Sequence, residues 1–494
     1  MPRPVVLVWL VCLAGCTAAP SAPAPSASAQ ALASSAGSGA AAATAAVAAP
    51  VLGSLSPADL DRYVAAVVES QHAVGVTVGV MHEGQLIFAK GYGLADVAAK
   101  TPVAPDTLFA IGSVTKQFTC AVALQLQQEG RLSLDDPVAK YAPAATRAAD
   151  ITVRDLAGMV SGYRDYYPLD FVDRPMAAAR PSAAIIAEFA SRPLDFAPRS
   201  RYSYSNTGYL LLGRIAELAG GEPFAVALER RLLTPLGLAH TRFEPARGGA
   251  GMAHGYTPIG LGPPEPAVPE GTGWIGAAGG LWSTPTDLLA WDLALIDGKV
   301  LAPASWALMT TPQTLTDGRS SGYGCGQSIR DRGPVLVLQH GGGVSGFGSR
   351  NAFIPASRSG VAVIANADWA GGVLDAIESA VLAKLMPVAD APVVAGSPAT
   401  EVALQLLTQV RAGEVDRRLL SDEYSAWLTP ERLAVMSRSL VAAGEVSEAV
   451  PGPIRERGGM EVSSLRLMLG TTPATTLMYR TPDGKVQEFL FNRR

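Results

Sequence analysis

Strand patterns occur near both ends of this chain, and a long stretch of helical patterns separates them. Near the start, two runs rich in valine, isoleucine and phenylalanine flank His82-Glu83-Gly84, which is typical of a β-hairpin. Strands that are remote in sequence can share one sheet, so the pattern predicts an α+β fold: an antiparallel sheet flanked by helices, with a large helical insertion. We expect strands at 75–81, 85–89, 335–339, 347–353 and 361–365, helices at 56–69 and 375–385, and the helical middle at 106–300.

The first 55 residues predict export rather than a folded unit. Residues 1–16 combine an early arginine, a short apolar run and small residues, which is typical of a secretory signal. The sequence Leu13-Ala14-Gly15-Cys16 resembles a lipobox, which implies cleavage before Cys16 and attachment of lipid to its thiol. Ordinary cleavage after Ala29 is the alternative. Residues 17–55, rich in alanine, serine and proline, then form a tether, and we expect a periplasmic or cell-envelope protein that meets the membrane only through its lipid anchor.

The remainder of the chain divides into two expected units. Residues 56–386 hold the sheet and its helical insertion, and 387–400 form a linker rich in proline, alanine, glycine and serine. Residues 401–494 begin with helical patterns and end with strand patterns at 461–469, 475–480 and 486–491. They predict a small α+β accessory domain, in which we find no group of residues suited to chemistry.

Composition excludes several classes of partner. The 494 residues carry a net charge of -4, so a nucleic-acid partner is not expected. Of the four cysteines, Cys12 and Cys16 lie in the leader, which leaves Cys120 and Cys325 in the folded part. That number suits neither a disulfide framework nor a zinc site, and the histidines lack ligand spacing, so we expect no metal and no cofactor. We interpret Cys120 as a small core residue rather than a nucleophile.

Ser113 and Lys116 form the first candidate catalytic pair. They stand at the start of an apolar run that predicts a buried helix, and residues three apart share a helix face. A serine becomes a nucleophile when a nearby base takes its proton, and burial lowers the pKa of a lysine enough for it to serve as that base. Chance is the alternative, but no other lysine of the chain has a serine three residues before it.

Tyr204 and Asn206 form the second candidate element, just before an expected helix at 207–218. A phenol can share or relay a proton with a lysine, and an asparagine amide can hold a substrate carbonyl. The structural alternative is a helix-capping asparagine beside a packed tyrosine.

The third element is the run His340, Gly341, Gly342 and Gly343 at the end of a strand. Glycines there permit a ligand to approach the backbone, so this edge could accept a peptide-like substrate as an added strand and supply an N–H to an oxyanion hole. A plain glycine-rich turn is the alternative. A Gly-x-Ser-x-Gly match at Ser320 lacks the strand before it and the helix after it that this motif needs, so we reject it as a nucleophile.

In this order and spacing, the three elements resemble the serine beta-lactamase and penicillin-binding-protein superfamily, in particular its class C type. The resemblance covers about residues 56–386 and implies a beta-lactamase/transpeptidase-like fold. It implies acyl transfer through a serine ester: Ser113 attacks, Lys116 and Tyr204 handle protons, Asn206 orients the substrate, and the N–H groups of Ser113 and Gly343 hold the oxyanion.

Two departures from the family pattern narrow the range of substrates that we expect. Class C beta-lactamases usually carry lysine where His340 stands, and a neutral histidine cannot replace that cation. Where His-Thr-Ser-Gly is common, this chain has Met159-Val160-Ser161-Gly162, followed by residues 163–167 (Tyr-Arg-Asp-Tyr-Tyr), which we expect to line the cleft.

We therefore expect a serine hydrolase that acts on a small-molecule or short-peptide substrate. A D-amino-acid peptide or amide, or a small ester, fits these residues better than a beta-lactam. The alternative is a catalytically weak, penicillin-binding-like sensor or cell-wall-binding lipoprotein that uses the same cleft.

Overall fold

The computed structural model describes residues 50–493 except 168–171, 259–261, 333–334, 387–393 and 453. The predicted signal peptide, Cys16 and most of the tether lie outside the described residues. The first described segment already packs, because Leu52 is buried in the same core as the first helix, four residues before the predicted start of order. No described helix combines the length and apolarity needed to cross a membrane.

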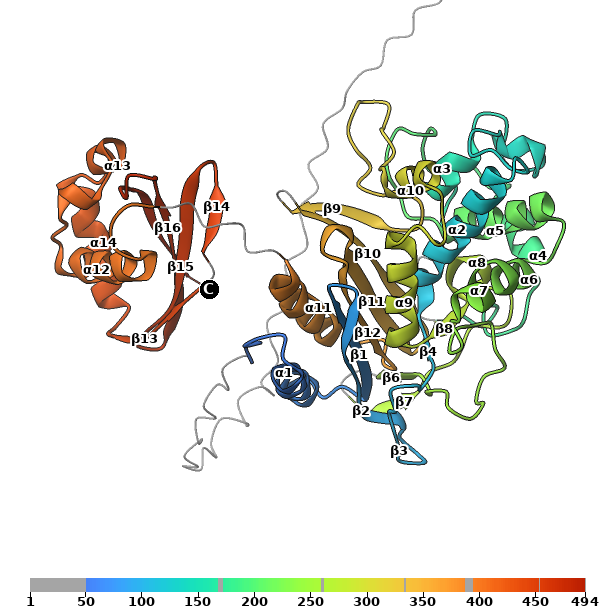
Figure 1. The fold of residues 1–494 in the computed structure, drawn as a ribbon, viewed down its shortest axis with the longest axis horizontal. Coiled ribbons are helices and arrows are strands. Elements are labelled where there is room, and N and C mark those ends of the chain that lie inside the picture. Colours follow the sequence, from blue (N-terminus) through green and yellow to red (C-terminus); the bar gives the residue numbers. More distant parts are fainter. Residues whose placement is uncertain are drawn as a thin grey trace, which may run out of the picture. The chain divides into compact units, whose positions relative to one another are not determined.

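A seven-stranded antiparallel sheet forms the centre of the larger unit, in the order β3-β2-β1-β12-β11-β10-β9 (Figure 1). The early hairpin joins the late strands through β1 and β12, where Val76 is opposite Ala365. The predicted strands are present, and β10 continues beyond the expected end at 339 because its glycines pair with β11. The bounds are β1 (Gly75–His82), β2 (Gln85–Asp96), β3 (Thr101–Pro102), β9 (Ser328–Arg332), β10 (Val335–Val344), β11 (Phe347–Ile354) and β12 (Ser359–Ala365).

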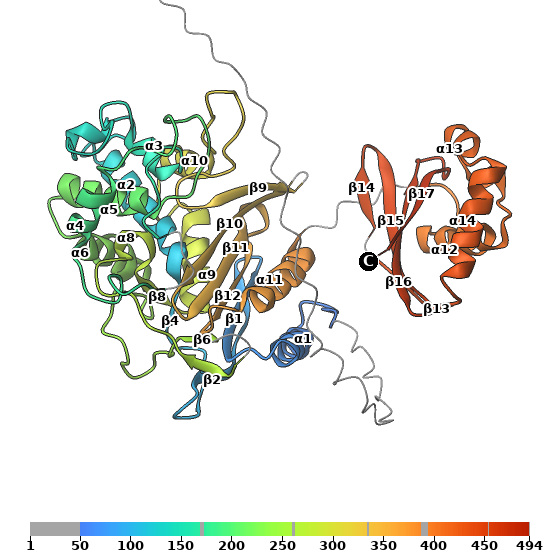
Figure 2. The same cartoon turned by 180° about the vertical axis from the view of Figure 1, so that it is seen from behind.

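Both faces of this sheet are covered, so β12 is buried at every position. Val361 and Val363 face a core shared with α1 (Pro57–Ser70) and α11 (Gly371–Leu385), while Ala362 and Ile364 face the core of the helical insertion. This two-sided burial follows from the side-chain alternation of a strand. Figure 2 shows α1 and α11 on the side of the sheet away from the insertion.

The helical insertion packs against the other face. Its helices are α2 (Thr115–Gln128), α3 (Val153–Ala157), α4 (Ser182–Phe189), α5 (Asn206–Gly220), α6 (Phe224–Leu228), α7 (Thr234–Leu236), α8 (Gly276–Gly279), α9 (Pro285–Ile296) and α10 (Pro303–Thr310). Small sheets accompany them, formed by β4 (Phe109–Ala110), β5 (Arg242–Phe243) and β8 (Leu281–Ser283), and by β6 (Tyr256–Pro258) and β7 (Pro264–Pro266).

A separate antiparallel sheet with its own core forms the C-terminal part, and with it the predicted α+β class is confirmed. The helices are α12 (Ala399–Ala412), α13 (Asp422–Trp427) and α14 (Pro430–Ala442), and the strands are β13 (Val446–Pro451), β14 (Arg455–Arg457), β15 (Met460–Leu469), β16 (Thr472–Arg480) and β17 (Val486–Arg493). Sequence patterns missed β13 and β14, since these strands have no fully buried residue and so no strong apolar alternation.

A disulfide joins Cys120 to Cys325, 205 residues apart in sequence. This corrects the expectation that the cysteine count suits no disulfide, whereas Cys120 is buried in the core, as expected. The bond fastens α2 to the segment before β9, and both cysteines are buried. Nothing local in the sequence marks this pair, because the distance between the two residues is set by the packing of the whole insertion.

Candidate active site

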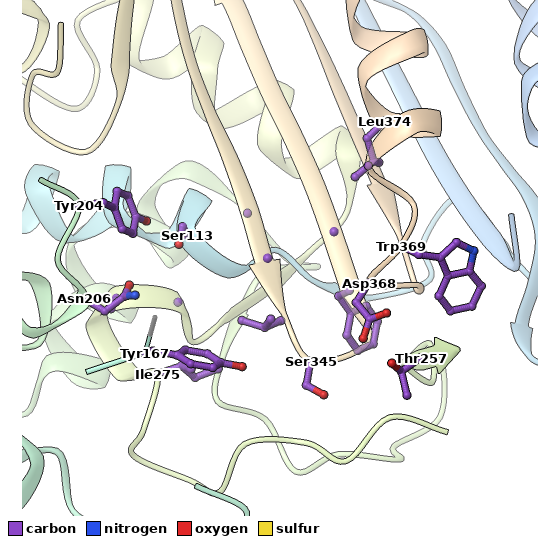
Figure 3. A pocket seen from close by; sticks show the side chains of 18 of the residues that line it. Ser113, Tyr167, Tyr204, Asn206, Thr257, Ile275, Ser345, Asp368, Trp369 and Leu374 are labelled. Carbon is purple, nitrogen blue, oxygen red and sulfur yellow. The ribbon is translucent and has the colours of Figure 1, made fainter. Parts of the chain in front are cut away.

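A pocket of about 580 Å³ lies where the helical insertion meets the open end of β10. The side chains in Figure 3 run from Tyr204, Ser113 and Asn206 on one side to Asp368 and Trp369 on the other. Its volume falls in the range of cavities that enclose a small ligand.

Ser113 stands in a short 3-10 turn, Gly112–Val114, that leads directly into α2. The hydroxyl is thus placed at a helix start, where free backbone N–H groups favour a developing negative charge. Gly112 has a φ of +51°, and a β carbon on it would lie 2.8 Å from the nitrogen of Gly343. Only glycine lets the nucleophile turn and β10 come this close.

Lys116 is fully buried one turn later, as the i, i+3 spacing predicted. Burial lowers the pKa of its ammonium group to about 7, and the charge of Asp165 acts in the opposite direction. A lysine with this pKa is partly neutral at pH 7, so it can accept a proton. Its Nζ atom donates hydrogen bonds to Ser113 Oγ at 2.9 Å, Asn206 Oδ1 at 2.8 Å and the Ala278 carbonyl at 2.6 Å.

The phenol of Tyr204 points toward Ser113 (Figure 3). Its oxygen is buried, and among the described residues no group completes a hydrogen bond of normal geometry to it. Burial raises the pKa of Tyr204 well above its ordinary value, and the nearby Ser113 hydroxyl opposes this rise. Lys116 Nζ lies 4.8 Å from the centre of the Tyr204 ring, so the two candidate proton carriers are immediate neighbours.

Asn206 is the first residue of α5, and Ser205 rather than Asn206 caps this helix. The amide of Asn206 is therefore free to face the pocket. Its Nδ2 atom donates to both carboxylate oxygens of Asp165 at 3.1 Å, and its backbone N–H donates to Asp165 at 3.2 Å. These contacts turn Oδ1 toward Lys116. Because the two carboxylate oxygens lie close together, one amide hydrogen serves both of these contacts, and the contact between Asn206 and substrate stays a prediction.

Asp165 is the functional residue that sequence reasoning did not single out. The signal was present, since it is the one acid in the loop 163–167 that was expected to line the cleft. The loop prediction needs a correction: Asp165, Tyr166 and Tyr167 line the pocket, but Tyr163 is buried and bonded to the Thr146 carbonyl, and Arg164 pairs with Asp195.

Only two glycines of the run 341–343 line the pocket. Gly342 and Gly343 line the pocket, along an edge of β10 that β9 leaves unpaired, because β9 pairs only with Val335–Gln339. A β carbon on Gly342 would lie 1.9 Å from the Ile111 carbonyl oxygen, whereas one on Gly343 would meet no atom within 4 Å. Gly342 is therefore needed for packing, and Gly343 keeps the pocket open.

His340 and Gly341 do not line the pocket, contrary to the expected contact with substrate. The His340 ring is buried behind it, 6.2 Å from the Tyr204 ring. Burial lowers the pKa of His340 to about 3, and the charge of Lys116 adds to this effect. The Gly341 carbonyl, 2.5 Å from Nδ1, can only accept, so Nδ1 carries the proton and Nε2 accepts from the Tyr323 hydroxyl at 2.8 Å.

Among the described residues, no group of three or more histidine, cysteine or acidic side chains is arranged to hold a metal ion. Ser320, the rejected nucleophile, is exposed, lies outside the pocket and accepts a hydrogen bond from Gly322 N.

The chain belongs to the beta-lactamase family, whose sequence profile matches residues 60–382. The predicted resemblance is thereby confirmed. In sequence, a D-aminopeptidase of Brucella canis and one of Brucella anthropi are each 28% identical to it over 294 residues, which is 58% of this chain and 55% of those proteins. The chain thus spans about half the length of the curated relatives it matches.

Solved structures with the same fold include a D-stereospecific amidohydrolase and a D-amino acid amidase. A D-stereospecific amidohydrolase from Streptomyces sp. superposes with a TM-score of 0.57 at 27% identity, covering 65% of this chain and 98% of that one. The D-amino acid amidase from Ochrobactrum anthropi SV3 has a TM-score of 0.57 at 26% identity, covering 66% of this chain and 98% of that one.

Proposed function

We propose that this chain is a serine hydrolase that forms an acyl-enzyme at Ser113 and cleaves amides or esters of D-amino acids or short peptides. The observation that carries this proposal is the 2.9 Å hydrogen bond between Ser113 Oγ and Lys116 Nζ, with the lysine buried so that its pKa falls to about 7. The D-aminopeptidase and D-amino acid amidase relatives support the substrate class.

In the proposed reaction, neutral Lys116 accepts the proton of Ser113 as its oxygen attacks the substrate carbonyl. The backbone N–H groups of Ser113 and Gly343 hold the oxyanion. When the carbonyl carbon loses its bond to the leaving nitrogen or oxygen, that atom receives the proton from the Lys116–Tyr204 pair. Water then attacks the ester carbonyl and gives its proton to the same pair. As the ester bond breaks, the pair passes that proton to Ser113 Oγ, which restores the serine hydroxyl and releases the carboxylic acid.

Hydrolysis of beta-lactams is less well supported by this site. Where class C beta-lactamases have a lysine, this chain has His340, which is neutral and turned away from the pocket. The cation that lines the pocket, Arg350, is already paired with Asp375 at 2.8 Å. A substrate carboxylate therefore finds no free cation among the described lining residues.

A substrate panel separates a hydrolase from a binding protein. We expect measurable turnover of D-alanine amide, a D-alanyl p-nitroanilide or a p-nitrophenyl ester, and slower turnover of a chromogenic cephalosporin. Product release is followed by absorbance or by ammonia assay, and a covalent adduct by intact mass. Stable acylation of Ser113 without release of product would instead favour the sensor, and no reaction with any compound would contradict both.

The rate should depend on pH through the Lys116–Tyr204 pair. Because the base must be neutral and burial holds the pKa of Lys116 near 7, kcat/KM should rise about tenfold per pH unit below that value and level off above it. The apparent pKa belongs to the coupled pair and not to one residue. A profile measured from pH 5 to 9 that stays flat would contradict the assignment of a lysine base.

We also propose that the chain is exported and anchored by lipid at Cys16. The disulfide supports export, since such bonds persist in oxidising compartments. Mass spectrometry of the mature N-terminus tests the anchor, and an unmodified terminus beyond Cys16 would contradict it.

A further inference from the structure

The pocket extends well beyond Ser113 in one direction, and the position of the catalytic groups indicates which part of a substrate lies there. The group that protonates the leaving atom must lie on the leaving-group side of the scissile bond. Tyr204 marks that side, at one end of the row of side chains in Figure 3. The acyl part of a substrate therefore extends the other way, along the free edge of β10 toward Ser345 and Asp368.

Asp368 lies beside the turn in which β10 ends. Val344 pairs with Phe347, which leaves Ser345 and Gly346 as the turn of this hairpin. Partial burial raises the pKa of the Asp368 carboxyl, and the neighbouring Thr257 side chain and the backbone N–H groups of Gly346, Asp368 and Trp369 oppose this rise. From Gly343 to Ser345, the first residue of the turn, the chain advances two residues, or about 7 Å at strand spacing. An extended acyl group of two or three residues spans this length.

No basic side chain among the described residues forms an ion pair with Asp368, and the groups that shift its pKa are all neutral. It is exposed to the pocket, with the partly buried Trp369 next to it. A carboxylate beside an aromatic ring is suited to an ammonium ion, which gains both a charge-assisted hydrogen bond and attraction to the ring face.

The second acid of the pocket, Asp165, is not available in the same way. Its two oxygens already hold the amide and the backbone of Asn206 next to Lys116. A substrate with its free amine on the residue that is cleaved would have to compete for those contacts. A substrate with its amine two or three residues away would reach Asp368 instead.

We propose that Asp368 and Trp369 bind the terminal ammonium group of a short peptidyl acyl donor, whose free amine lies two or three residues from the cleaved bond. This proposal rests on the proposed acyl transfer at Ser113 and names its substrate class. It separates the chain from enzymes that remove a single N-terminal residue, because the amine is recognised at the far end of the pocket.

Three p-nitroanilides test the proposal: D-Ala, D-Ala-D-Ala, and N-acetyl-D-Ala-D-Ala. For the wild-type chain we expect kcat/KM to be about 10- to 100-fold higher for the free dipeptide than for its acetylated form, and higher for the dipeptide than for the single residue. Asp368→Asn should remove the preference for the free amine. Asp150→Asn, which changes an exposed acid outside the pocket, should retain it. As a second variant, Asp368→Lys should reverse the preference toward an N-succinyl dipeptide.

Three results would overturn the proposal while the function stands: acetylation without effect in the wild type, a preference for the free amine that survives Asp368→Asn, or faster cleavage of the single-residue substrate than of the dipeptide. p-Nitrophenyl acetate serves as the reference substrate, and the absence of turnover of every compound, this ester included, would overturn the proposed function as well. Thermal melting of each variant confirms that it is folded.

Discussion

Replacing Ser113 with alanine should reduce kcat by about 10⁴-fold or more, and Lys116→Ala should reduce it by about 10²- to 10⁴-fold. Ser113→Ala removes the atom that forms the acyl bond. Lys116→Ala leaves that atom in place but removes the base 2.9 Å away, so the hydroxyl is no longer activated. Steady-state hydrolysis of a p-nitrophenyl ester and acyl-enzyme formation by intact mass both measure these effects.

The two variants differ in their risk to folding. Ser113→Ala removes one hydrogen bond, whereas Lys116→Ala leaves a cavity and two unpaired buried acceptors, the Asn206 amide oxygen and the Ala278 carbonyl.

Lys140→Ala, which removes an exposed lysine, is the matched control and should keep wild-type activity. The double variant should be no slower than Ser113→Ala alone, since the pair acts as a unit. Equal turnover by Ser113→Ala and wild type would contradict the proposal that the chain hydrolyses its substrate through Ser113.

Breaking the bond between Cys120 and Cys325 should lower the free energy of unfolding by about 3 to 5 kcal/mol. A cross-link between residues 205 apart removes much of the entropy of the unfolded chain, and this effect grows with the logarithm of loop length. The Cys120→Ala/Cys325→Ala variant, compared with wild type by thermal or urea unfolding, measures the loss. We expect a transition at lower temperature for the variant.

The same bond should also affect activity, because it holds a segment that touches the catalytic helix. Next to Cys325, a β carbon on Gly326 would lie 2.5 Å from the Lys116 carbonyl oxygen, and Tyr323 in the same segment bonds to His340. We expect kcat to fall together with stability. Reduction of the native protein followed by thiol titration is the control. Identical unfolding of oxidised and reduced protein would contradict a stabilising role.

Local patterns in the sequence predicted much of this structure. The spacing of Ser113 and Lys116 predicted their contact, since residues three apart on a helix are neighbours whatever surrounds them. Short runs rich in β-branched and other apolar residues likewise predicted β1, β2, β10, β11 and β12, because such side chains pack well on a buried sheet. The residue types also predicted that the glycines at the end of β10 would leave its backbone open to a ligand, and that His340 would be neutral.

Longer-range relations were decided only by the tertiary structure. Asp165 turns the Asn206 amide toward Lys116, His340 faces Tyr323 instead of the pocket, and Cys120 meets Cys325, although none of these pairs shares a helix turn or a strand. Asp368 follows β12 by three residues, and it lies at the end of the pocket because β12 pairs with β11, the neighbour of β10 in the sheet. The sequence alone determined which residues could do chemistry, since side-chain type and local periodicity are properties of short segments. Which of them meet depends on how the sheet and the insertion pack, and that packing sums weak contacts over the whole chain.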